Sequence, residues 1–137
     1  MKERQVKIVN QAEYLNKIIQ MAEGNGEIAS VWLYGSRARN THSNTSDYDI
    51  AVLFSSFISD PLERRLRPEQ LSMEWSQACR QEVNIVDISL VHLPLAMTVL
   101  NDNQLLFDGN TGLRLRFEQS IMSKWELDYL YNEARYA

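Results

Sequence analysis

The sequence predicts a domain of the α/β (α+β) class, in which helices flank a mixed sheet of about four strands. Two short apolar runs, residues 28–34 and 48–54, indicate buried strands because both are rich in bulky apolar residues, and glycines bound the first. A third run, residues 83–88, alternates apolar and polar residues as a half-buried strand does. Apolar residues at helical spacing near both ends of the chain indicate that helices flank these strands.

The first helix and the segment after the second strand follow from local signals. Apolar residues spaced from Ile8 to Ala22 predict a helix of about four turns, which the glycine-rich residues 24–26 end. Residues 55–67 are polar and are expected to be irregular. Pro68 is then expected to begin a helix that runs to about residue 80, since proline favours the first helical position.

The C-terminal half continues the alternation of helix and strand. Pro94 predicts a short helix to about residue 100, and residues 104–107 predict a fourth strand before a turn. A last helix is expected over about residues 113–135. Its apolar stripe at four-residue spacing consists of Leu113, Phe117, Ile121 and Trp125. Its second half carries more aromatic residues than one buried stripe requires, which fits either packing on the sheet or an interface with a partner.

Composition limits the function classes. With 137 residues, 45% of them hydrophobic, the chain is expected to form one domain over residues 1–137. Its formal net charge of -4 gives no overall basic field, so long nucleic acids are disfavoured as substrates. The lone Cys79 excludes an internal disulfide and fits a reducing compartment. No apolar run resembles a signal sequence or a membrane span, so a cytoplasmic protein is expected.

Two short elements at a fixed separation carry the chemistry. Gly35 and Ser36 follow the first strand, and Asp47 and Asp49 begin the second. Glycine lets the backbone approach a phosphate closely, while the hydroxyl and the N–H groups of a tight turn attract anions. Taken alone, the first element is most often a helix cap and the second a solvated loop end. Their combination indicates a nucleotide and metal site.

The carboxylates of Asp47 and Asp49 are expected to bind Mg²⁺ together. Alternation along a strand points both to the same face, with their Cα atoms about 6.5–7 Å apart. Mg²⁺ prefers oxygen ligands, and one or two carboxylates with phosphates complete a common shell. Asp87, near the end of the third strand, is expected to reach the same centre if that strand pairs beside the second. Two bridged ions would then stabilise the attacking and leaving oxygens of an in-line displacement.

Glycine and serine at 35 and 36, ten intervening residues, and Asp47-x-Asp49 resemble the signature of the DNA polymerase β-like nucleotidyltransferase superfamily. Asp87 is expected to occupy the position at which that superfamily carries its third carboxylate. Within that superfamily the short chain and the run Gly-Ser-Arg-Ala-Arg most resemble the minimal nucleotidyltransferases, the MNT antitoxins that pair with HEPN-domain toxins in prokaryotes. Asn40 stands where many relatives carry glycine, and because asparagine tolerates left-handed backbone the turn is expected to survive.

The resemblance implies transfer of AMP from ATP to a hydroxyl of the partner HEPN toxin, with tyrosine as the expected acceptor, which silences the toxin's ribonuclease activity. It implies that Asp47, Asp49 and Asp87 hold two Mg²⁺ ions and act in catalysis, and that Gly35 and Ser36 bind the triphosphate. Arg39 is a further candidate for phosphate binding. Two alternatives stay open: an antitoxin that neutralises the toxin by binding alone, and a nucleotidyltransferase that acts on a small molecule or an RNA end.

Overall fold

The computed structural model of the chain describes residues 10–136 and contains four helices and four strands within them. Ile8, which the predicted first helix included, lies outside the described residues. The order along the chain is α1 (Gln11–Glu23), β1 (Ile28–Tyr34), β2 (Tyr48–Phe54), α2 (Pro61–Cys79), β3 (Val83–Asp87), α3 (Leu93–Asp102), β4 (Gln104–Asp108) and α4 (Thr111–Tyr136).

The four strands form one mixed sheet in the order β3-β2-β1-β4. β1 pairs antiparallel with both β2 and β4, and β2 pairs parallel with β3. The fold class predicted from the sequence is therefore confirmed. The parallel pair brings the first residues of β2 beside the first residues of β3.

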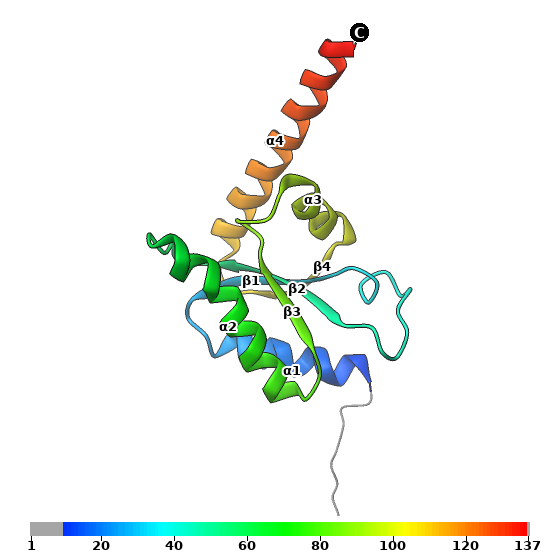
Figure 1. Cartoon of the computed structure of the whole chain (residues 1–137), viewed down its shortest axis with the longest axis vertical. Coiled ribbons are helices and arrows are strands. Elements are labelled where there is room, and N and C mark those ends of the chain that lie inside the picture. Colours follow the sequence, from blue (N-terminus) through cyan, green and yellow to red (C-terminus); the bar gives the residue numbers. More distant parts are fainter. Residues whose placement is uncertain (1–9, 137) are drawn as a thin grey trace, which may run out of the picture.

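Helices cover both faces of the sheet (Figure 1). The first face, called here the α1/α2 face, packs β-strand residues such as Ile50 and Val52 against α1 and α2. The second, the α3/α4 face, packs residues such as Ala51 and Leu53 against α3 and α4. Because neighbouring residues of β2 go to opposite faces, each side chain of the strand can be assigned to one face.

The prediction that Pro68 begins a helix after an irregular segment is wrong, because α2 begins at Pro61. Asp60 caps this end, and its carboxylate accepts a hydrogen bond from the Glu63 N–H at 2.9 Å. A proline within a helix removes one backbone hydrogen bond. Pro68 is nevertheless buried there, together with three residues that pack the helix on the sheet: Leu71, Trp75 and Cys79.

Helix α4 has two different halves. Leu113, Phe117 and Ile121 pack on the α3/α4 face, as the predicted stripe requires. Beyond them the helix extends away from the rest of the domain (Figure 1) and its apolar side chains are exposed. Trp125, the fourth residue of the predicted stripe, is 42% exposed. Among the described residues, no helix combines the length and the apolar character that crossing a membrane requires.

Candidate nucleotide and metal site

Gly35 ends β1 in a conformation that favours glycine. Its φ is +81°, and a Cβ added to it would lie 2.6 Å from Oδ2 of Asp49. Any other residue here would be strained and would collide with that carboxylate. The chain then makes a tight turn, in which the Ala38 and Arg39 N–H groups both donate to the Gly35 carbonyl at 3.1 Å. The glycine turn and the carboxylate therefore touch.

The loop that follows returns to β2 beside this turn (Figure 1). Asn40 adopts a φ of 60°, so the expectation that asparagine preserves the turn is confirmed. The Thr41 N–H donates to the Ser36 carbonyl at 2.9 Å, which closes the turn around Ser36. Asp47 is exposed at the entry to β2, and Asp49 is half-buried opposite Tyr34 of β1.

Arg37 holds this loop from the α1/α2 face. Its guanidinium donates to the Ser46 carbonyl through Nε at 3.1 Å and Nη2 at 2.9 Å, and it lies 4.0 Å from the ring centroid of Tyr48. The Tyr48 ring stacks on Tyr14 of α1 with 3.7 Å between centroids. Arg37 is only 6% exposed. It is therefore a structural clamp on the residues directly before and after Asp47, rather than a phosphate ligand.

Arg39 lies at the other side of the turn and is paired with Asp102, the last residue of α3. Its Nη1 lies 3.1 Å from both carboxylate oxygens of Asp102. The same carboxylate accepts a hydrogen bond from the Gly35 N–H at 2.9 Å. Since the Asp102 side chain is 8% exposed and that of Arg39 is 50% exposed, Asp102 is the fixed partner and Arg39 the accessible one. Nothing in the local sequence indicated this role of Asp102.

The structure does not bring Asp87 to the other two carboxylates. β3 does pair beside β2, as that expectation required, but Asp87 pairs with Val52, three residues beyond Asp49. This separation is about 10 Å along the sheet. Alternation also places Asp87 on the α1/α2 face with Val52, whereas Asp49 is on the opposite face. Asp87 is 4% exposed and accepts hydrogen bonds from the N–H and hydroxyl of Ser89.

Asn84 takes the place that was expected for Asp87. It is the register partner of Asp49 on β3, and its Nδ2 lies 3.3 Å from Oδ2 of Asp47. Asn84 was not predicted because an acidic residue was expected at the third position. A signal was present, since Asn84 is a polar residue between two apolar ones at the start of a strand. Asn84 also lines a groove formed by α2 and the segment that leads into β3.

The electrostatics of the pair agree with a cation site. Burial raises the pKa of Asp49 above its usual range, and the charge of Asp47 adds to the rise, while Asn84 and Arg39 oppose it. The expected repulsion between the carboxylates is therefore real, although burial is the larger cause. Burial and the nearby Asp49 also raise the pKa of Tyr34 to about 12, so this phenol stays neutral.

The residues present fit a divalent cation with bound phosphates. Asp47 directly precedes β2 and Asp49 is its second residue, and Asn84 of β3 lies beside both. Gly35 leaves the space beside Asp49 that a Cβ would fill. The third side chain at this point is a neutral amide. Within residues 10–136, no group of three or more His, Cys, Asp or Glu side chains is arranged to hold a metal. The donor set is thus two carboxylates and one amide.

Solved structures share this fold. The chain is similar to a toxin–antitoxin with AMP-PNP, at 23% identity and a TM-score of 0.70 over 88% of this chain and 93% of that one. It is similar to the toxin–antitoxin MntA–HepT, at 22% identity and a TM-score of 0.67 over 90% and 94%. A third match is the tri-AMPylated Shewanella oneidensis HEPN toxin in complex with MNT antitoxin, at 21% identity and a TM-score of 0.65 over 90% and 92%.

Comparison with curated proteins found no match. The family described as polymerase beta, nucleotidyltransferase, in contrast, matches residues 16–111, which run from α1 through β4 to the first residue of α4. That segment contains the glycine turn and both carboxylates. The chain therefore belongs to the polymerase beta nucleotidyltransferase family.

Proposed function

We propose that this protein is an antitoxin that transfers AMP from ATP to a hydroxyl of a HEPN-domain toxin and thereby neutralises it. The observation that carries the proposal is the contact between the glycine turn and the carboxylate pair, where a Cβ on Gly35 would lie 2.6 Å from Oδ2 of Asp49. A polyphosphate on the turn and a cation on Asp47 and Asp49 would share one place. The fold shared with MNT antitoxins supports the choice of partner.

The chemistry is a displacement at the α-phosphorus of ATP. The acceptor oxygen forms a bond to the α-phosphorus, the bond to the oxygen that bridges to the β-phosphate breaks, pyrophosphate leaves, and the hydroxyl proton passes to water. Mg²⁺, when bound, neutralises phosphate charge and polarises the reacting phosphate. Asp47 and Asp49 would hold that ion, and Gly35 and Ser36 would cradle the phosphates. Arg39 keeps an exposed side chain with which to contact them.

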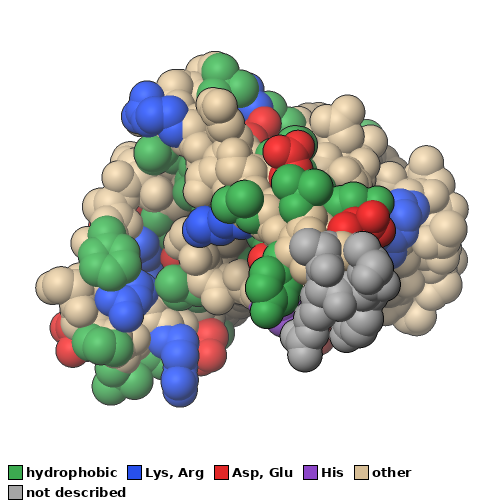
Figure 2. Space-filling model, turned by 90° about the horizontal axis from the view of Figure 1, so that it is seen from above, with side chains coloured by type: hydrophobic (Ala, Val, Ile, Leu, Met, Phe, Trp, Pro, Cys, Tyr) green, Lys and Arg blue, Asp and Glu red, His purple; other side chains and the backbone are tan. Residues whose placement is uncertain are grey.

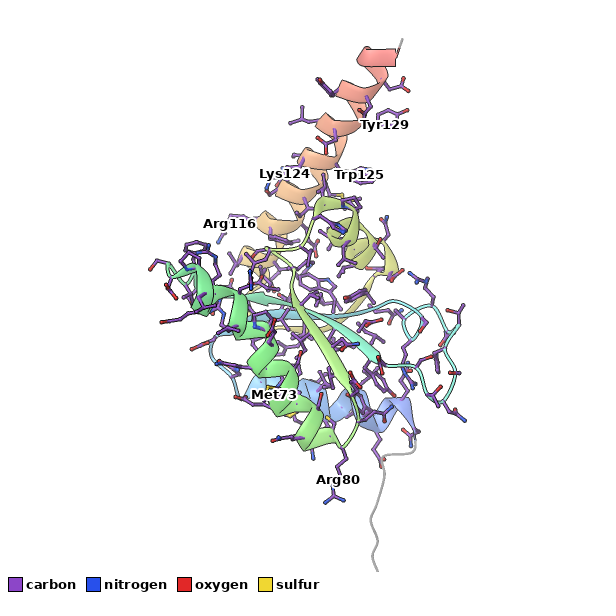
Figure 3. All side chains as sticks on the ribbon, in the orientation of Figure 1. Met73, Arg80, Arg116, Lys124, Trp125 and Tyr129 are labelled. Carbon is purple, nitrogen blue, oxygen red and sulfur yellow. The ribbon has the colours of Figure 1, made fainter. Side chains whose placement is uncertain are left out.

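The acceptor class is supported by two surface features. On the side of the molecule that carries α3 and α4, basic, acidic and apolar side chains are mixed (Figure 2). The described residues seen there form no continuous basic patch of the kind that binds long nucleic acids. The second half of α4 exposes large apolar side chains, among them Trp125 and Tyr129 (Figure 3). A helix that is apolar on several sides is typical of burial in an assembly. We assign this half of α4 to contact with the toxin.

The test is transfer of label from α-labelled ATP to the co-expressed toxin. Asp47→Asn and Asp49→Asn should abolish labelling while circular dichroism shows an intact fold. Asp60→Asn is the matched control, because it makes the same chemical change at a helix cap where asparagine serves as well as aspartate. Labelling by Asp47→Asn or Asp49→Asn at the wild-type rate would show that the assigned site is wrong.

Neutralisation by binding alone is a second candidate, and the exposed half of α4 favours it independently of the nucleotide site. A protection assay in cells that express the toxin distinguishes AMP transfer from neutralisation by binding. If Asp49→Asn protects them as well as the wild type does, covering the toxin suffices. If protection is lost while the variant still co-purifies with the toxin, AMP transfer is required.

A further inference from the structure

Asn84 is the third side chain at the carboxylate pair. The parallel register of β2 and β3 puts it beside Asp49, and its amide nitrogen lies 3.3 Å from Oδ2 of Asp47. Alternation places Asn84 on the face of Asp49, since its neighbours Val83 and Ile85 belong to the opposite face. The contact therefore joins the two strands at the point where a cation would bind.

An amide at this position changes the charge available to metal ions. Asp47 and Asp49 carry two negative charges, which balance one divalent cation. Asp102 adds nothing, because its carboxylate already pairs with Arg39 and the Gly35 N–H. A second divalent cation would face a neutral amide on one side and the guanidinium of Arg39 on the other. Phosphate oxygens alone would then have to hold it against that charge.

We propose that the nucleotide-bound site holds one divalent cation tightly, and that Asn84 sets this number. Asn84 acts as a positioning residue: its amide donates to Asp47 and orients that carboxylate, but it supplies no charge for a second ion. This inference rests on the proposed nucleotide site and replaces the two-ion arrangement expected from the sequence. The substitution Asn84→Asp adds one carboxylate at the same place and thereby creates the donor set for a second ion.

The experiment counts Mn²⁺ ions by electron paramagnetic resonance of free Mn²⁺, in the presence of saturating α,β-methylene ATP, which cannot transfer AMP. The wild-type chain should bind one Mn²⁺ per nucleotide complex. Asn84→Asp should bind two, with the second at least about tenfold tighter than in the wild type. Asn84→Ala should bind one, about tenfold more weakly, because Asp47 loses the group that orients it.

Asp87→Asn is the control, since Asp87 lies on the other face of the sheet and should leave the count at one. Thermal melts with and without Mn²⁺ check folding, and Asn84→Asp should gain the larger stabilisation. Two ions bound equally tightly by the wild type, or an unchanged count in Asn84→Asp, would overturn this inference and leave the nucleotide site standing. Failure of every variant to bind the nucleotide by calorimetry would overturn both.

Discussion

Replacement of Gly35 by alanine perturbs the contact on which the site depends. The φ of +81° lies in the left-handed region, where a non-glycine residue costs about 1–2 kcal/mol. The added Cβ would lie 2.6 Å from Oδ2 of Asp49. Because that oxygen ends a side chain, it can move at a cost of about 1 kcal/mol, at the low end for overpacking. The free energy of unfolding should fall by about 2–3 kcal/mol, which lowers the melting temperature by about 6–12 °C.

The effect on function should exceed the effect on stability. Relief of the contact moves the Asp49 carboxylate away from the position that it shares with the glycine turn. A displacement of about 1 Å at a reacting centre can lower the rate on the order of a hundredfold. Gly35→Ala should therefore retain its fold by circular dichroism at low temperature, bind Mg²⁺ and nucleotide weakly by calorimetry, and transfer AMP at about one hundredth of the wild-type rate.

Gly26→Ala is the matched control for this prediction. A Cβ at Gly26 would meet no atom within 4 Å, and its φ is outside the left-handed range. This variant should melt within a few degrees of the wild type and keep its activity, because alanine at an unstrained position mainly restricts the unfolded chain. If Gly35→Ala melted and bound nucleotide as Gly26→Ala does, the close approach of the turn to Asp49 would have no functional meaning.

Three further predictions concern charge. Arg37→Lys keeps the charge but loses the planar group that donates twice to Ser46, so urea denaturation should show a loss of about 2–4 kcal/mol; an unchanged midpoint would refute the clamp. Asp49 has a raised pKa in the folded state, so the metal-free protein should lose stability as pH rises from the ordinary value of an Asp carboxyl through that raised pKa. Asp49→Asn should lack this loss and melt above the wild type at neutral pH without Mg²⁺, whereas a lower melting temperature would contradict it. The guanidinium of Arg114, whose Nε lies 3.0 Å from Oδ1 of Asp108, lowers the pKa of that carboxyl. The Asp108 carboxylate should therefore stabilise the protein above its ordinary pKa and cease to do so as pH falls through the lowered one. Asp108→Asn should flatten the dependence of melting temperature on acid pH, and an unchanged slope would count against the pair.

The parts of the site that the sequence predicts are local. Gly35, Ser36, Asp47 and Asp49 lie in one stretch of chain, and strand alternation alone puts both carboxylates on one face. Asp87 lies away from its expected position beside the pair for the opposite reason, because that position depends on how two strands pair. Which residue of β3 lies beside Asp49 depends on the direction and register of the pairing between two strands. The alternation within β3 reveals neither the direction nor the register of this pairing. The acid near the end of β3 was therefore expected beside Asp49, and the asparagine at its start was not.

The same distinction explains the fold. Strand positions were predictable because each strand is a short apolar run with clear ends. The start of α2 differs from the predicted one because Pro68 is a strong local signal for a first helical position, whereas the Asp60 cap and the packing of the helix on the sheet decide where it begins. The role of Asp102 required knowledge of where α3 ends in space, since its partners are more than sixty residues away along the chain.

The segment that carries the two carboxylates is held in place from the α1/α2 face, opposite to the face on which Asp49 lies. Tyr48 lies between Asp47 and Asp49 in sequence, so its ring must point to the α1/α2 face when they point to the other. There it is held between Tyr14 and Arg37, and Arg37 also holds the loop directly before Asp47. Core packing thus fixes the strand that carries the two charges. This packing in the core keeps the segment that carries two mutually repelling carboxylates in place.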